Sequence, residues 1–270
     1  MPVNKGQDGR RWVEAEVEVP GTPDQVWQAI ATGPGVTSWF VPAQVEERVG
    51  GAVISNFGPG MESHATVTAW DPPHRFTAES RDLGPNGPTI ATEWSVEAKS
   101  GDTCVVRVVH AWFADSDDWD GQFEAFTEGW PAFFRILRLY LARYRGQAGT
   151  NIQVLGVGQG GQAAAWAAFA GRLGLVGAKP GQRVEPAADA PALAGQVVHA
   201  ADTEQSKELL LQLDAPAQGI GHLFASKPIG GQIYLSVRFY LFDGAAAAGQ
   251  EEAAWRAWLG RHFPMPGQPG

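Results

Sequence analysis

His110 is the side chain in the first half of the chain that is best placed to do chemistry. Residues 103–113 alternate as a strand does, which puts Val106, Val108, His110 and Trp112 on one face. An imidazole on an otherwise apolar face can contact a ligand or act as an acid or base, although a lone strand histidine is more often structural. We find no Ser-His-Asp order, nucleophile elbow or close carboxylate pair, so the sequence gives no positive case for catalysis.

A group of aspartates ahead of a predicted helix suggests a calcium site: Asp115, Asp117, Asp118 and Asp120. An EF-hand loop needs Gly at position six and Glu at position twelve, but counting from Asp115 gives Asp120 and Phe126. Acidic residues before a helix also stabilise its dipole without a metal. Cys104 is the only cysteine, so neither an internal disulfide nor a thiolate zinc site can form. We therefore predict no metal ion and no cofactor.

Gly156, Gly158 and Gly161 match the dinucleotide-binding pattern G-x-G-x-x-G between a predicted strand and an Ala-rich helix. Glu185 lies at a tolerable distance for a ribose contact. A dinucleotide fold also needs parallel strands joined by helices, whereas only short runs punctuated by Gly and Pro follow Glu185. We therefore expect these glycines only to turn a strand into the helix that carries Trp166.

The acidic charge of the chain, −9 overall, is concentrated in its first half. Residues 1–150 hold 12 basic and 20 acidic side chains, a net charge of −8, and the remainder holds 8 and 9, a net charge of −1. Nucleic-acid binders need a basic footprint, so we expect no nucleic-acid partner. No run of eighteen apolar residues occurs and the N-terminal stretch has no apolar segment of a signal peptide. We expect a soluble cytoplasmic protein without a membrane span.

A long amphipathic helix, predicted over residues 127–144, is the element around which the first half is organised. Apolar side chains recur at helical spacing along one side of it: Trp130, Phe133, Phe134, Leu137, Tyr140, Leu141 and Tyr144. Thr127 is the expected N-cap, Pro131 is tolerable in a first turn, and Gly146 can end the helix. Such an aromatic helix needs a broad partner surface.

Strand-like runs separated by turn residues supply that surface: 12–19, 44–48, 52–57, 64–70, 75–80, 90–98 and 103–113. Thr22 caps a short helix after the first run, and a second small helix precedes Trp39. Alternation within residues 64–70 places Trp70 on the face of His64, opposite Val67. The predicted order is a strand, two small helices, six strands and the long helix.

Several short motifs, in this order and spacing, make residues 12–145 resemble a known superfamily: Val26-Trp27, Trp39-Phe40-Val41-Pro42, Gly50-Gly51, Asp71-Pro72-Pro73-His74-Arg75-Phe76 and Gly129-Trp130. The chain resembles the START-like superfamily, also called SRPBCC or birch-pollen-allergen-like. The nearest group is that of the activator homologues of the ninety-kilodalton heat-shock chaperone's ATPase. The resemblance implies an α+β helix-grip fold, in which an antiparallel sheet wraps around the long C-terminal helix, often with an apolar cavity between them.

The second half looks like a degenerate copy of the same fold. Residues 151–171 repeat the order of residues 13–33, a strand, a Gly-rich break and a helix with an inward Trp. Runs at 194–201, 207–214, 219–225 and 232–242 are predicted strands, and a final helix, shorter than that of the first copy, is predicted over 251–263. We predict two tandem START-like domains, 1–146 and 150–270, and expect any chemistry in the first.

The resemblance raises the hypothesis that part of the aromatic set lines a pocket, although each aromatic residue could simply fill the core. The predicted ligand cavity comprises Trp39, Phe40, Trp70, Trp94, His110, Trp112, Trp130, Phe133, Phe134 and Leu137. The first functional hypothesis is non-catalytic binding of a small hydrophobic or aromatic molecule between sheet and helix. The alternatives are an interaction module for a chaperone or other protein, and an enzyme of the polyketide cyclase or aromatase kind.

Overall fold

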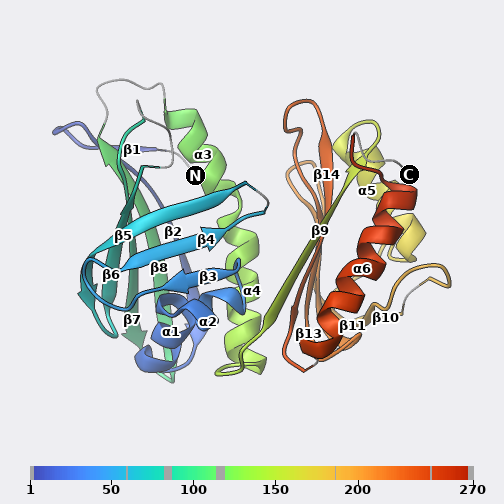
Figure 1. Ribbon diagram of the computed structural model, residues 1–270, viewed down its shortest axis with the longest axis horizontal. Helices are drawn as coiled ribbons and strands as arrows, with labels where there is room; N and C mark the ends of the chain where they lie inside the picture. Colours follow the sequence, from blue (N-terminus) through green and yellow to red (C-terminus); the bar gives the residue numbers. More distant parts are fainter. Residues whose placement is uncertain are drawn as a thin grey trace. The chain divides into compact units, whose positions relative to one another are not determined.

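The computed structural model describes residues 3–58, 60–81, 87–113, 119–185, 187–243 and 245–266 (Figure 1). Contacts divide the chain into two compact units, residues 1–148 and 149–270. In each unit helices pack against an antiparallel sheet, so the α+β class predicted from the sequence is confirmed. No helix in the described ranges is both long and apolar enough to cross a membrane.

The described part of the first unit forms a sheet of eight strands in the order β1-β2-β8-β7-β6-β5-β4-β3. The first long strand therefore pairs with the last, and the others follow in descending order. All neighbours are antiparallel. The bounds are β1 (Asn4–Lys5), β2 (Arg10–Pro20), β3 (Ala43–Val45), β4 (Ala52–Asn56), β5 (Glu62–Asp71), β6 (Arg75–Ser80), β7 (Ile90–Lys99) and β8 (Thr103–Phe113).

Two short helices follow β2, α1 (Pro23–Ala31) and α2 (Gly33–Thr37). Thr22 caps α1 as predicted, since its hydroxyl accepts from the Gln25 N–H while the Gln25 side chain accepts from the Thr22 N–H. Val26, Trp27 and Ile30 form the buried side of α1. These helices position residues 39–42 beside the sheet.

The helix predicted over residues 127–144 is interrupted at Gly129: its first two residues end α3 (Asp120–Glu128), and the rest forms α4 (Trp130–Arg143). Thr127 as its N-cap is therefore wrong, because Thr127 lies inside α3, and Gly129 occupies the N-cap of α4. The cause is Pro131, which has no N–H and whose ring would clash with the Thr127 carbonyl in a continuous helix. The predicted apolar side of α4 is buried apart from partly accessible Phe133, and the helix packs against β2 (Figure 1). The sheet and α4 make up the helix-grip arrangement.

The second unit repeats this topology with fewer strands. Its described residues form a six-stranded sheet in the order β10-β11-β12-β13-β14-β9, so the first strand again pairs with the last. One helix follows the first strand and one follows the last, as α1 and α4 do in the first unit. The bounds are β9 (Thr150–Gly158), α5 (Gln162–Leu173), β10 (Arg183–Val184), β11 (Ala194–Asp202), β12 (Lys207–Ala215), β13 (Gly219–Ala225), β14 (Ile233–Leu241) and α6 (Ala245–His262).

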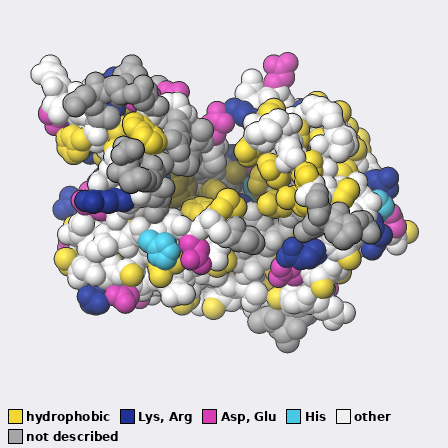
Figure 2. All heavy atoms as spheres, turned by 45° about the horizontal axis from the view of Figure 1, so that its top comes forward, with side chains coloured by type: hydrophobic (Ala, Val, Ile, Leu, Met, Phe, Trp, Pro, Cys, Tyr) yellow, Lys and Arg dark blue, Asp and Glu magenta, His cyan; other side chains and the backbone are white. Residues whose placement is uncertain are grey.

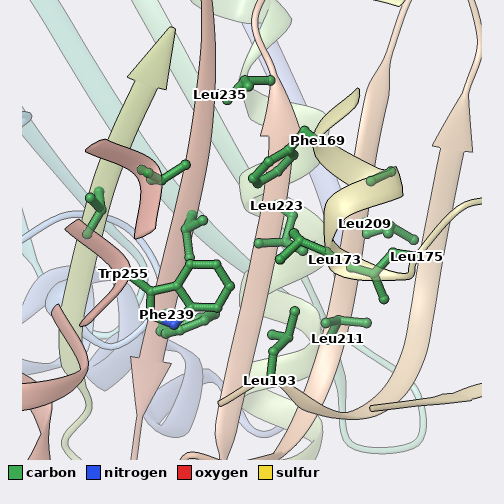
Figure 3. Close-up of a cluster of buried hydrophobic side chains, with 14 of the residues drawn as sticks. Phe169, Leu173, Leu175, Leu193, Leu209, Leu211, Leu223, Leu235, Phe239 and Trp255 are labelled. Carbon is green, nitrogen blue, oxygen red and sulfur yellow. The ribbon is translucent and has the colours of Figure 1, made fainter. Parts of the chain in front are cut away.

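The core of the second unit lies between its sheet and the helices α5 and α6. Figure 3 shows part of it, with Phe169 and Leu173 of α5, leucines of β12 and β13, and Trp255 of α6 packed together. The prediction that the last helix is shorter than that of the first unit is wrong, because α6 has 18 residues and α4 has 14. Its first turns, rich in alanine, carry no apolar periodicity that the sequence pattern could detect.

The glycine motif of the second unit serves close packing. A Cβ at Gly156 would lie 2.7 Å from the Phe263 carbonyl oxygen, and one at Gly158 would lie 2.4 Å from the Ala165 Cβ. Both positions of β9 are therefore restricted to glycine by the chain that packs on them. All strand pairs of this sheet are antiparallel, so the parallel scaffold of a dinucleotide site is not present in the part that the structure describes.

Candidate functional site

A cavity of about 160 Å³ lies in the first unit between strands β3–β8 and the helical segments α1, α2 and α4. It is the candidate site, because it occupies the place that the helix-grip fold predicts for a ligand. Its lining consists of Ile30, Val36, Trp39, Phe40, Ala43, Val45, Val53, Ser55, Phe57, Ser63, Ala65, Phe76, Ala78, Ser80, Thr92, Trp94, His110 and Trp130. None of these described lining residues is Asp, Glu, Lys or Arg.

Aromatic rings from the sheet, from α4 and from the segment after α2 meet in the wall of the cavity. Phe40 stacks on Trp130 at a centroid distance of 5.3 Å and meets Phe133 edge-on at 4.5 Å. Trp94 of β7 meets Trp130 edge-on at 5.2 Å and Trp39 at 6.1 Å. These edge-to-face and offset arrangements are the favoured geometries of aromatic pairs. They give the cavity a rigid apolar wall that suits another ring.

His110 is held at both ring nitrogens. The Trp130 indole Nε1–H donates to His110 Nε2 at 3.1 Å, and His110 Nδ1 lies 2.9 Å from the Thr92 hydroxyl oxygen. Burial lowers the pKa of His110 to about 4, because the imidazolium would lose its hydration. The neutral ring is thus the form present near pH 7. With both nitrogens engaged and so low a pKa, His110 is poorly suited to act as a general base.

Hydroxyl groups form a diagonal row on the sheet side of the cavity: Ser55, Ser63, Ser80 and Thr92, followed by His110. The strand register produces this row, because Ser55 pairs with Ser63 and Thr92 pairs with His110, while the steps between are diagonal. Strands β4–β8 therefore contribute a row of polar groups to a lining that also holds the aromatic rings of Phe76 and Trp94 from the sheet and of Trp130 from α4.

The cavity reaches the surface beside the turn between β4 and β5. Phe57 both lines the cavity and is 40% exposed, and Met61 in the same turn is 54% exposed. The Phe57 N–H donates to the Met61 carbonyl, which closes the turn. Phe57 also meets Phe40 edge-on at 5.7 Å. Phe57 is therefore a lining side chain that also contacts solvent.

Half of the predicted cavity residues line it: Trp39, Phe40, Trp94, His110 and Trp130. Phe133 contacts Phe40 outside the lining, Phe134 packs behind Trp94 and Trp130, and Leu137 is fully buried. These three residues support the wall but do not form its surface. The roles of all ten in ligand binding stay a prediction.

Trp70 and Trp112 are the two predicted residues that belong to other clusters. A β-bulge between Val67 and Ala69 moves Trp70 onto the face of Val67, which corrects the placement beside His64. Trp70 packs there against Trp27 at 5.1 Å and Phe76 at 5.4 Å. Trp112 shares the face of His110, as predicted, but lies beyond the cavity and stacks on Phe123 of α3 at 3.5 Å.

The sequence pattern did not predict that Thr92, Ser55, Ser63 and Ser80 line the cavity. Thr92 and Trp94 share a face in the alternating pattern of β7, which is the one available signal. Only the register of β7 against β8 puts Thr92 opposite His110.

The acidic cluster shows no metal-binding arrangement where the structure describes it. Asp120 accepts two hydrogen bonds from the Arg11 guanidinium, at 2.8 and 2.7 Å, and pairs with Lys5 at 3.0 Å. Asp115, Asp117 and Asp118 lie outside the described residues. Within the described ranges, no group of three or more His, Cys, Asp or Glu side chains could hold a metal ion.

Basic and acidic side chains of the described residues are interspersed on the face that Figure 2 shows, without an extended patch of either sign. This face does not resemble the basic footprint of a nucleic-acid binder, and the expectation of no nucleic-acid partner stays a prediction.

Residues 20–142 match the family model described as "Activator of Hsp90 ATPase homolog 1-like protein". This segment lies within the first unit and contains the motifs on which the resemblance rests, so the predicted START-like relationship is confirmed. A comparison with curated proteins gave no match.

Among solved structures, the chain is similar to the di-domain ARO/CYC BexL from the BE-7585A biosynthetic pathway, with 15% identity, coverage of 96% of this chain and 100% of that one, and a TM-score of 0.46. It is also similar to DynU16, a putative protein in the dynemicin biosynthetic locus, with 18% identity, coverage of 92% and 95%, and a TM-score of 0.43. Protein MLL2253 from Mesorhizobium loti has 20% identity, coverage of 50% and 98%, and a TM-score of 0.45. Likenesses of this strength assign no function.

Proposed function

Because the first unit belongs to the START-like superfamily, through the activator-of-Hsp90-ATPase-homologue family that it matches, we propose that it binds a small uncharged aromatic molecule in its cavity. The observation that carries the proposal is a cavity walled by Trp39, Phe40, Trp94 and Trp130 without a charged side chain in its described lining. An ion would be desolvated there without a counter-charge, whereas a neutral ring would find both apolar contacts and hydroxyl groups in the lining.

The volume limits the ligand to about one ring. A cavity of roughly 150 Å³ in another protein holds benzene, whereas pockets for drug-sized molecules exceed about 300 Å³. The 160 Å³ cavity therefore suits a single substituted ring, and larger substituents would extend past Phe57. Burying about 150–250 Å² of apolar surface contributes roughly 4–6 kcal/mol, and lost translational and rotational freedom offsets part of it, so we expect a dissociation constant of about 0.1 mM or weaker for a simple ring.

Titration calorimetry with toluene, together with tryptophan fluorescence, tests this proposal. Ala78 is buried and lines the cavity, so Ala78→Leu should fill it and weaken toluene binding at least about tenfold. Ala52→Leu makes the same change on an exposed outward position of β4 and serves as the matched control. Equal binding by Ala78→Leu and the wild type, or no binding by the wild type at millimolar toluene, would refute the proposal.

The family match favours a second candidate, a protein-interaction role such as activation of a chaperone ATPase. Purified ninety-kilodalton chaperone mixed with this protein should then hydrolyse ATP faster. Stimulation that is unaffected by Ala78→Leu would assign the role to a surface other than the cavity.

A further inference from the structure

We propose that the Thr92 hydroxyl is the group that selects the ligand, by donating a hydrogen bond to an uncharged acceptor oxygen such as a ketone or aldehyde carbonyl. This inference rests on the proposed function, since it names the class of molecule that the same cavity takes. It follows from the order of donors and acceptors along Trp130, His110 and Thr92.

Trp130 determines the tautomer of His110. An indole N–H can only donate, so His110 Nε2, which lies 3.1 Å from Trp130 Nε1, must be the acceptor. A neutral imidazole has one N–H and one bare nitrogen, so the proton resides on Nδ1. The indole and the imidazole belong to α4 and β8, and their rings lie 21° from parallel, which holds this bond in place.

The tautomer in turn determines the role of Thr92. His110 Nδ1–H donates to the Thr92 oxygen across 2.9 Å, so the threonine is an acceptor in this pair. Its own hydroxyl hydrogen is then available for another acceptor, and no acceptor for it is found among the residues that the structure describes. Because Thr92 lines the cavity, a ligand oxygen can supply that acceptor.

The surroundings of Thr92 restrict the acceptor to an uncharged group. The described lining holds no Lys or Arg that would stabilise a carboxylate, and the neutral His110 adds no positive charge. The rings of Phe40, Trp94 and Trp130, which line the same cavity, accommodate the apolar part of the molecule. A single ring bearing a carbonyl can therefore contact these rings and the Thr92 hydroxyl together.

Two ligands of nearly the same shape test the inference: acetophenone, which has a carbonyl, and α-methylstyrene, which has a methylidene group in its place. Calorimetry gives the dissociation constant of acetophenone divided by that of α-methylstyrene, for the wild type and for Thr92→Val. The change in this ratio between the two proteins measures the contribution of the hydrogen bond from the hydroxyl to the carbonyl. Valine suits a strand, and its extra methyl covers His110 Nδ1–H, so that the imidazole cannot replace the lost donor. We expect Thr92→Val to weaken acetophenone binding relative to α-methylstyrene by about three- to tenfold.

Thr66→Val is the matched control, because Thr66 is exposed on the outer face of β5. Thr66→Val should leave the ratio of dissociation constants at its wild-type value. Thr92→Ser keeps the hydroxyl and should also give a ratio close to that of the wild type. His110→Phe tests the positioning role of His110: it keeps a ring beside Trp130 but frees the Thr92 hydroxyl to rotate, so it should weaken acetophenone binding relative to α-methylstyrene by less than Thr92→Val does.

The outcomes separate the two proposals. Binding of both ligands with a ratio that Thr92→Val does not change overturns the inference and leaves the proposed function standing. Binding of neither ligand to the wild type overturns both. Binding of benzoate as tight as that of acetophenone at pH 7 overturns the restriction to uncharged acceptors.

Discussion

Loss of stability on mild acidification should be traceable to His110. Its pKa of about 4 in the folded protein lies below the ordinary value of 6.5, because burial disfavours the imidazolium. Below pH 6.5 the unfolded chain therefore binds a proton that the folded chain does not, and the free energy of unfolding falls as the pH falls. The loss accumulates between pH 6.5 and 4 and levels off below pH 4, where both states are protonated.

The size of the effect follows from the pKa difference. Each pKa unit corresponds to about 1.4 kcal/mol, so His110 should lower the stability by about 2 kcal/mol at pH 5 and about 3 kcal/mol at pH 4. Protonation would also place an Nε2–H against the Trp130 N–H, so two donors would face each other.

Urea denaturation of the wild type and of His110→Gln between pH 7.5 and 4 measures this contribution. Glutamine does not titrate, and its side-chain oxygen can still accept from Trp130. The contributions of the other titrating groups to the pH dependence are common to both proteins and cancel in the difference between their unfolding free energies. Thr66→Val, a change at an exposed position of β5 that does not involve a titrating group, is the control and should follow the wild type. A difference between wild type and His110→Gln that stays constant over this range would refute the neutral state of the partly buried His110.

Three further predictions concern packing and domain structure. Phe134→Ala should destabilise the protein by about 3–5 kcal/mol in chemical denaturation, because the ring is 4% exposed and packs on Trp130, and a loss below about 1 kcal/mol would contradict this packing. Gly158→Val should lower the melting temperature because of the 2.4 Å approach to Ala165, and calorimetry with NAD should show no binding before or after the change. A fragment of residues 1–146 should unfold in one cooperative transition, because it contains the complete sheet and α4; a featureless melting curve would speak against this.

Much of the secondary structure could be predicted because its signals are local. Period-two alternation marks β2 and β8, helical spacing marks the inner side of α4, and Thr22 marks the start of α1. The errors also have local causes. The bulge at Val67 leaves no trace in the alternation, and the alanine-rich start of α6 has no apolar period.

The sequence by itself determined the two-part organisation, the side of α4 that is buried and the face of β8 that carries His110. The two faces can be predicted because side-chain direction recurs with a fixed period along a strand and along a helix, so the sequence pattern shows it directly. Tertiary structure alone decided that Thr92 lies opposite His110, that Trp130 donates to the same imidazole, and that a space of about 160 Å³ remains among the rings. Strand register and the packing of side chains from distant elements determine these features. Both depend on residues far apart in the sequence, so the local pattern cannot predict them.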